Sequence, residues 1–158
     1  MPKKTKVKKK LKYAEFFDRL IAFLIDLILI AIPLFVAVLI SMILSHVGFI
    51  SGPLAGMVSV IIMLIWIAAI LAMVVIFVYN NIYLVATKGV SFGRRIMKLK
   101  VVDLKGKYPI GYSKTLLRLV GKAICILTLG LGFLLILTDE KRQGLHDRIA
   151  DTYVIKEE

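Results

Sequence analysis

Two apolar runs, from Leu20 to Leu44 and from Leu54 to Val78, dominate the sequence. Each run has 25 residues, and a helix of about 20 apolar residues is long enough to cross a bilayer. Hydrophobic residues make up 59% of the 158-residue chain, which is too apolar for a soluble protein whose surface faces water. The sequence therefore predicts an integral membrane protein, folded as one unit, whose first two helices span the bilayer.

A third apolar segment, Leu119–Leu137, is a weaker candidate for a span. It contains the charged Lys122, and Gly130 and Gly132 interrupt it. A full span, a broken helix and a re-entrant hairpin buried in protein are all compatible with this pattern. The predicted fold class is an all-α membrane protein with two full transmembrane helices and this third segment. We divide the chain into a basic N-terminal segment 1–19, a membrane domain 20–155 with spans near 20–44, 54–79 and 116–137 and a loop 80–115, and a tail 156–158.

Basic residues are concentrated in two of the segments that flank the spans. Seven lysines lie within the first 12 residues, and residues 79–115 contain eight basic residues against one acid, whereas segment 45–53 has no lysine or arginine. Cytoplasmic loops carry the excess of lysine and arginine in membrane proteins. The N-terminus and loop 80–115 are therefore predicted to be cytoplasmic in a multi-pass protein of the cell membrane. The residues after Leu137 include four basic and six acidic ones, which does not place the tail, although we expect it in the cytoplasm.

The net charge of +12 lies mainly in these flanking segments, and this indicates anionic lipid headgroups as partners. No nucleic-acid recognition module is visible, so nucleic acid is not an expected partner. The two histidines, His46 and His146, are far apart and lack neighbouring cysteine or histidine, so neither a metal site nor a cofactor is expected.

Loop 80–115 contains a pattern typical of a small β-hairpin. Leu99, Val101 and Val102 lie beside charged residues and indicate a short strand, Lys105-Gly106 favours a turn, and Tyr108–Ile110 reads as an extended return. Thr152–Ile155 in the tail is also β-prone. The tail segment can pair with the loop only if both lie on the same side of the membrane.

Asp26 is a carboxylate inside the first apolar run, where hydrocarbon tolerates an ionisable group only if it is neutralised, paired or hydrated. Arg19 lies seven residues earlier, on the same helical face about 10 Å away. If the first and third segments both enter from the cytoplasm, Lys122 lies at the same depth as Asp26, about 9 Å along its helix. Arg118 shares a helical face with Lys122, so we expect Asp26 to pair with these basic residues.

Two functions are compatible with such a polar cluster. In a transporter, Asp26 binds a proton or a monovalent cation, and several copies form a homo-oligomer because two or three helices are too narrow to enclose a pathway. In an accessory membrane protein, the cluster is a brace that fixes helix register, and the basic hairpin docks lipid or a protein partner. For the cluster itself we favour the brace, because perturbed ion pairs are often structural.

Gly89-Val90-Ser91-Phe92-Gly93 matches a G-x-S-x-G pattern, but a hydrolase elbow requires a strand before it and a large α/β sheet around it. The chain is therefore not expected to be an enzyme. The glycines instead favour a tight turn that brings Arg94 and Arg95 to the membrane surface, where backbone N–H groups and guanidinium groups bind phosphate. The candidate lipid contacts are Gly89, Ser91, Gly93, Arg94 and Arg95.

Three segments together resemble the RDD family of membrane proteins, which is named for one arginine and two aspartates. They are residues 17–26 (FDRLIAFLID), 89–103 (GVSFGRRIMKLKVVD) and 142–154 (RQGLHDRIADTYV). The resemblance assigns the family arginine to Arg19, the first aspartate to Asp26 and the second to Asp147. Asp151 departs from the pattern, because similar proteins often have glycine there. For some members the resemblance implies a transport role, including sodium–proton exchange.

Overall fold

The computed structural model describes residues 12–48 and 53–157. Most of the predicted basic N-terminal segment therefore lies outside the described residues. The chain forms two compact units, one of residues 27–78 and one of residues 1–26 with 79–158, and each is described by itself.

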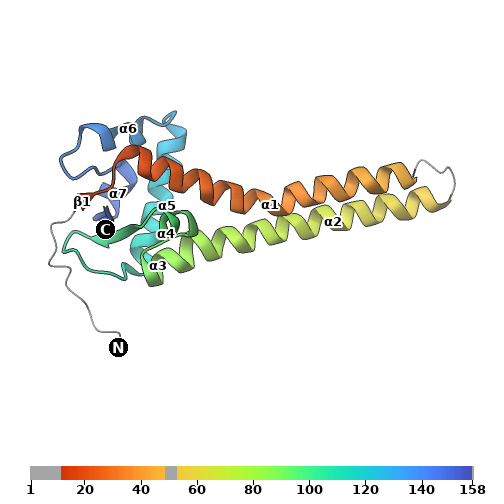
Figure 1. The fold of residues 1–158 in the computed structure, drawn as a ribbon, viewed down its shortest axis with the longest axis horizontal. Coiled ribbons are helices and arrows are strands. Elements are labelled where there is room, and N and C mark those ends of the chain that lie inside the picture. Colours follow the sequence, from red (N-terminus) through yellow and green to blue (C-terminus); the bar gives the residue numbers. More distant parts are fainter. Residues whose placement is uncertain (1–11, 49–52, 158) are drawn as a thin grey trace. The chain divides into compact units, whose positions relative to one another are not determined.

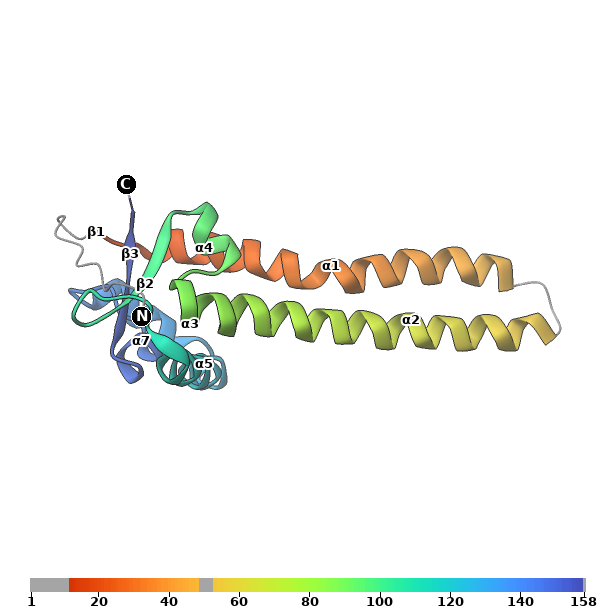
Figure 2. The same cartoon turned by 90° about the horizontal axis from the view of Figure 1, so that it is seen from below.

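The unit of residues 27–78 consists of two long helices, α1 (Phe16–Gly48), which begins in the other unit, and α2 (Pro53–Val78). Within this unit they run antiparallel and side by side (Figures 1 and 2). Helical segments of 31 and 34 residues, Phe16–His46 and Ala55–Lys88, are long and apolar enough to cross a membrane. Because most of their large apolar side chains are exposed, lipid can cover them. The two predicted spans are confirmed.

The second span continues beyond α2 without a break in its helical course. A π-helical turn, η1 (Tyr79–Tyr83), leads into α3 (Leu84–Lys88). Gly89 ends α3 with a φ of 72°, a left-handed conformation that glycine adopts without steric cost. The chain then turns into the short helix α4 (Phe92–Ile96).

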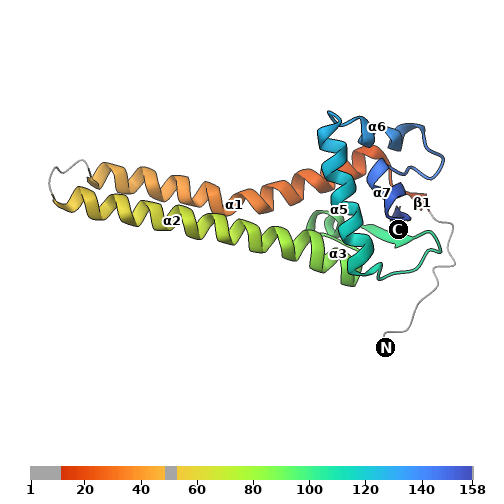
Figure 3. The same ribbon diagram turned by 180° about the vertical axis from the view of Figure 1, so that it is seen from behind.

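The third apolar segment is a broken helix. It consists of α5 (Gly111–Leu127) and α6 (Leu131–Thr138), whose axes are bent by 106° at the break. Gly130 lies at the break with a φ of 85°, so a residue that tolerates this backbone conformation allows the sharp corner. Figure 3 shows α5, α6 and the following α7 (Leu145–Ile149) as neighbours on one side of their unit.

A three-stranded antiparallel sheet joins distant parts of the chain, in the order β1 (Lys12–Tyr13), β3 (Thr152–Lys156), β2 (Leu99–Asp103). The predicted strands in the loop and tail are confirmed, and they pair with each other. The predicted return, Tyr108–Ile110, is not a strand. Instead, the Gly106 N–H donates to the Asp103 carbonyl and closes a turn.

The core of this unit lies beside the sheet. Leu99, Val101 and Val154 are almost completely buried and pack with Ala14 and Ala22. Burial of these side chains stabilises the pairing of strands that are remote in sequence.

The sheet also limits how α5 and α6 meet the bilayer. Strands of one sheet bond directly, so β1, β2 and β3 lie on the same side of a membrane. The helices α1 and α2 separate β1 from β2, and if each crosses the bilayer once, the chain returns to that side. A complete crossing by α5 and α6 would then put β3 on the opposite side. We therefore expect this pair to re-enter or to lie along the interface.

We expect cysteines introduced at Lys12 and Glu157 to react with a membrane-impermeant maleimide from the same side of the membrane. Both side chains are exposed; Lys12 lies in β1, and Glu157 directly follows β3. A cysteine at Ser45, near the far end of α1, is expected to react only from the opposite side. The native Cys125 is buried and should give little background. If Glu157→Cys reacts only from the side on which Ser45→Cys reacts, β1 and β3 do not lie on the same side of the membrane.

Candidate functional site

Asp26 is held by three neutral hydrogen-bond donors. Its carboxylate accepts bonds from Asn80 Nδ2 at 2.8 Å, Ser91 Oγ at 2.6 Å and the Gly93 backbone N–H at 2.7 Å. The Asn80 side-chain oxygen in turn accepts a bond from the Phe92 N–H at 2.7 Å. Only 6% of Asp26 is exposed. The carboxylate therefore joins α1 to the start of the π-turn and to the beginning of α4.

Gly93 permits this contact because it has no side chain. A Cβ built at Gly93 would collide with the backbone carbonyl of Ala22, one turn before Asp26 on α1. The G-x-S-x-G sequence thus allows the backbone at Gly93 to lie against the backbone of α1 at Ala22. Ser91 and Gly93 both donate hydrogen bonds to Asp26.

Asp147 is the centre of a second polar cluster, and its side chain is fully buried. Arg19 Nη1 lies 2.5 Å from its Oδ2, and Arg118 Nη1 lies 2.5 Å from its Oδ1. Arg118 Nη1 also donates to Thr152 Oγ1 at 2.5 Å. One carboxylate on α7 therefore joins α1 to α5, and Arg118 extends the cluster to β3.

His146 lies next to this ion pair, with Nε2 3.2 Å from Asp147 Oδ1. Burial alone would raise the pKa of the Asp147 carboxyl, but Arg118, His146 and Arg19 together outweigh burial and hold that pKa well below its usual range. Burial lowers the pKa of His146 despite the neighbouring carboxylate. Asp147 is therefore charged and His146 neutral at physiological pH.

The structure separates residues that the sequence analysis placed in one cluster. Within the described part of the chain, no hydrogen bond or ion pair joins Asp26 to Arg19, Arg118 or Lys122. The two arginines pair with Asp147 instead. The number of residues from each predicted membrane entry placed Asp26 and Lys122 at the same depth. Such a count carries no information on which helical faces meet. Asn80 was not predicted as a partner, although an amide at the end of an apolar run was a visible signal.

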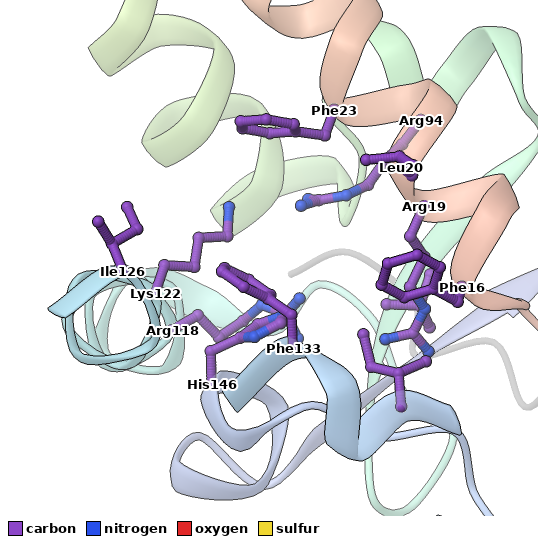
Figure 4. Close-up of a pocket in the computed structure, with 12 residues that line it drawn as sticks. Phe16, Arg19, Leu20, Phe23, Arg94, Arg118, Lys122, Ile126, Phe133 and His146 are labelled. Carbon is purple, nitrogen blue, oxygen red and sulfur yellow. The ribbon is translucent and has the colours of Figure 1, made fainter. Parts of the chain in front are cut away.

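A cavity of about 380 Å³ opens beside the Asp147 cluster. Four cationic side chains line it: Arg19, Arg94, Arg118 and Lys122. Much of the remaining wall is apolar and includes Phe16, Leu20, Phe23, Ile126 and Phe133. Figure 4 shows the Lys122 ammonium and the Arg94 guanidinium pointing toward one another across the cavity. The site is thus cationic at its centre and apolar around it.

Arg94 and Lys122 differ from Arg19 and Arg118, which both pair with Asp147. Both side chains are partly buried, and neither forms an ion pair or a side-chain hydrogen bond with any residue that the structure describes. Burial, together with the nearby charge of Arg118, lowers the pKa of Arg94 to about 10. The guanidinium therefore stays charged at neutral pH although it lies in a poorly hydrated site.

Of the five predicted lipid contacts, only Arg94 lines the cavity. Ser91 and Gly93 bind Asp26, Gly89 ends α3, and Arg95 is exposed on α4. These residues are adjacent in the sequence, which is why they were expected to act together, but the turn directs neighbouring residues to different contacts. Residues 12–48 and 53–157 contain no group of three or more histidine, cysteine, aspartate or glutamate side chains arranged to hold a metal ion.

A comparison of the sequence with known families identifies the family of this chain. The sequence model described as the RDD family matches residues 13–151, a range that contains both carboxylate clusters and all four cations of the cavity. The chain belongs to the RDD family. This RDD family protein is a membrane protein. It has two long helices that are candidate spans and, in addition, the bent pair of α5 and α6.

Curated relatives match about half of the chain. The proline-rich antigen homolog of Mycobacterium tuberculosis is 36% identical over 78 residues, which are 49% of this chain and 32% of the relative. The proline-rich antigen of Mycobacterium leprae is 35% identical over 75 residues, 48% of this chain and 30% of the relative. The uncharacterized protein RP437 of Rickettsia prowazekii is 34% identical over 70 residues, 44% of this chain and 38% of the relative. The chain spans about a third of the length of these relatives, and no solved structure matches it.

Proposed function

We propose that this protein is a non-catalytic membrane protein that binds the anionic headgroup of a bilayer lipid in the cationic cavity. The observation that carries the proposal is the pair Arg94 and Lys122, two partly buried cations that face each other without a partner among the described residues. An unpaired charge in a poorly hydrated site is unfavourable. An anionic ligand between the two side chains would neutralise both.

The apolar wall supports a lipid as the source of that anion. Phe16, Leu20 and Phe23 come from the start of the first span, and Ile126 and Phe133 come from the broken helix pair. A headgroup between the cations would place its acyl chains against these side chains. If the basic segments are cytoplasmic, as their lysine and arginine content predicts, the lipid belongs to the cytoplasmic leaflet.

The two carboxylate clusters have a supporting role in this proposal. Asp26 joins α1 to α4, the helix that carries Arg94. Asp147 binds Arg19 and Arg118, which line the same cavity. Both carboxylates thus hold cationic side chains in place around the ligand, which agrees with the interpretation of the family residues as a brace.

Lipid binding to the purified protein tests the proposal, measured by native mass spectrometry in detergent with anionic and zwitterionic lipids of identical acyl chains. We expect Arg94→Gln to weaken binding of the anionic lipid by about tenfold or more, since one lost charge contact in a poorly hydrated site is worth at least 1.4 kcal/mol. Arg95→Gln is the matched control, because Arg95 is exposed on the same helix. Equal binding of anionic and zwitterionic lipids, or equal effects of the two substitutions, would reject the cavity as a lipid site.

Exchange of a monovalent cation and a proton at Asp26 is the second candidate function. The burial of Asp26 inside a long apolar helix favours it, whereas the three donors around the carboxylate occupy the positions that a cation would take. If transport depends on Asp26, folded Asp26→Asn protein in proteoliposomes should lose cation and proton flux. Full flux in that variant would eliminate the titrating-site mechanism.

A further inference from the structure

We propose that the cavity selects a phosphate monoester dianion, carried on a lipid, over singly charged headgroups such as a phosphodiester or a carboxylate. This inference rests on the proposed function, and it adds the chemical class of the headgroup. It follows from the balance of charge around the cavity, from the number of free donors and from the apolar wall.

The charge balance leaves two positive charges for the ligand. Four cations line the cavity. Asp147 contacts two of them, Arg19 and Arg118. Asp26 does not line the cavity and is bound by neutral donors, but counting it as well gives four basic side chains against two carboxylates. The surplus is two positive charges when Lys122 is protonated, the form that a bound anion stabilises. The neighbouring His146 is neutral at physiological pH and adds no charge, so a dianion completes the balance.

The free donors match the oxygens of a monoester. A monoester presents three peripheral oxygens, whereas a phosphodiester presents two. The planar guanidinium of Arg94 can bind two phosphate oxygens at once, and the Lys122 ammonium supplies three further N–H donors. Arg19 Nη2 is buried and has no hydrogen-bond partner among the described residues. Three cationic groups around the cavity thus have unused donors for three oxygens.

The apolar wall distinguishes a lipid from free phosphate. Phe16, Phe23 and Ile126 line the cavity together with the cations, and free phosphate would leave these side chains without a partner. A lipid-borne monoester would use both parts of the lining, with its phosphate between Arg94 and Lys122 and its acyl chains on the aromatic side.

The experiment compares dioleoyl phosphatidic acid, a monoester, with dioleoyl phosphatidylglycerol, a diester with the same acyl chains, in the purified full chain. At pH 7 we expect phosphatidic acid to bind about tenfold more tightly or better, because most of it carries one more charge in a site of low dielectric. The second pKa of a phosphate monoester is near 6, so this preference should largely disappear at pH 5. Lys122→Gln should remove the preference at pH 7. Lys114→Gln should retain it, because Lys114 lies on the same helix but pairs with Asp103 outside the cavity.

The outcomes separate this inference from the proposed function. Equal affinity for the two lipids at pH 7 would overturn the selection of a dianion but leave lipid binding intact. No binding of any anionic lipid would overturn both. Competition by inorganic phosphate as effective as that of phosphatidic acid would support the dianion and reject the lipid. The pH comparison uses the unaltered protein, so it decides the question even if Lys122→Gln does not fold.

Discussion

Asp147→Asn is expected to lower the free energy of unfolding by about 3–5 kcal/mol, the usual effect of removing one partner from a buried ion pair. Asp147 is completely buried and binds Arg19 and Arg118 at 2.5 Å each. An asparagine of the same shape would leave both guanidinium groups in place without their counter-charge. Because the carboxylate joins α1 to α5, and Arg118 in turn binds β3, we expect loss of the whole unit rather than local fraying.

Thermal unfolding of the purified protein in detergent measures this effect. The folded fraction that remains after heating is determined by size-exclusion chromatography. Asp103→Asn is the matched control, since Asp103 also forms an ion pair at 2.5 Å, with Lys114, but is partly exposed. Exposed pairs contribute about 0–1 kcal/mol. Equal losses of unfolding free energy in the two variants would show that Asp147 is not the central ion-pair partner of Arg19 and Arg118.

Gly93→Ala is expected to destabilise the protein by about 3 kcal/mol, from overpacking and from the strained hydrogen bond to Asp26. The added methyl group would collide with the backbone carbonyl of Ala22 and lie 3.2 Å from the Asp26 carboxyl carbon. Backbone at Ala22 cannot rotate away as a side chain can. The turn must therefore move, and the Gly93 N–H to Asp26 bond of 2.7 Å must lengthen.

Gly56→Ala is the matched control for this substitution. Gly56 lies in the second long helix, and a Cβ there meets no atom within 4 Å. Alanine in a helix interior is more favourable than glycine by about 0.5–1 kcal/mol, so Gly56→Ala should leave the unfolding temperature unchanged or raise it. Unfolding temperatures for Gly93→Ala that match those of the unaltered protein would contradict the close approach.

The sequence predicted the features that depend on local composition. The two long runs of apolar residues were sufficient to identify both spans, because the thickness of the bilayer sets the length that such a run requires. The apolar and charged residues of Leu99–Asp103 and the β-prone tail identified two of the three strands. Gly130 marked the site at which the third helix breaks, since it is the residue at the sharp corner with a φ of 85°.

The contacts of the candidate site did not follow from the sequence. Sequence spacing indicated that Asp26 needed a partner, but it favoured charged residues at equal depth over Asn80 and Ser91, which actually bind it. Arg94 was selected for its position after a glycine turn, and nothing in that pattern placed it opposite Lys122.

The physical reason lies in the range of the interactions involved. Transfer of apolar residues from water to lipid depends on each residue and its neighbours, so the membrane class, the two spans and the requirement for a partner of Asp26 can be read from the amino-acid order. Pairing of charges depends on which helical faces meet, and these faces belong to segments more than 100 residues apart, as for Arg19 and Asp147. Only the folded unit decides that Asp147 pairs with Arg19 and Arg118, while Arg94 and Lys122 line the same cavity without an ion-pair partner among the described residues.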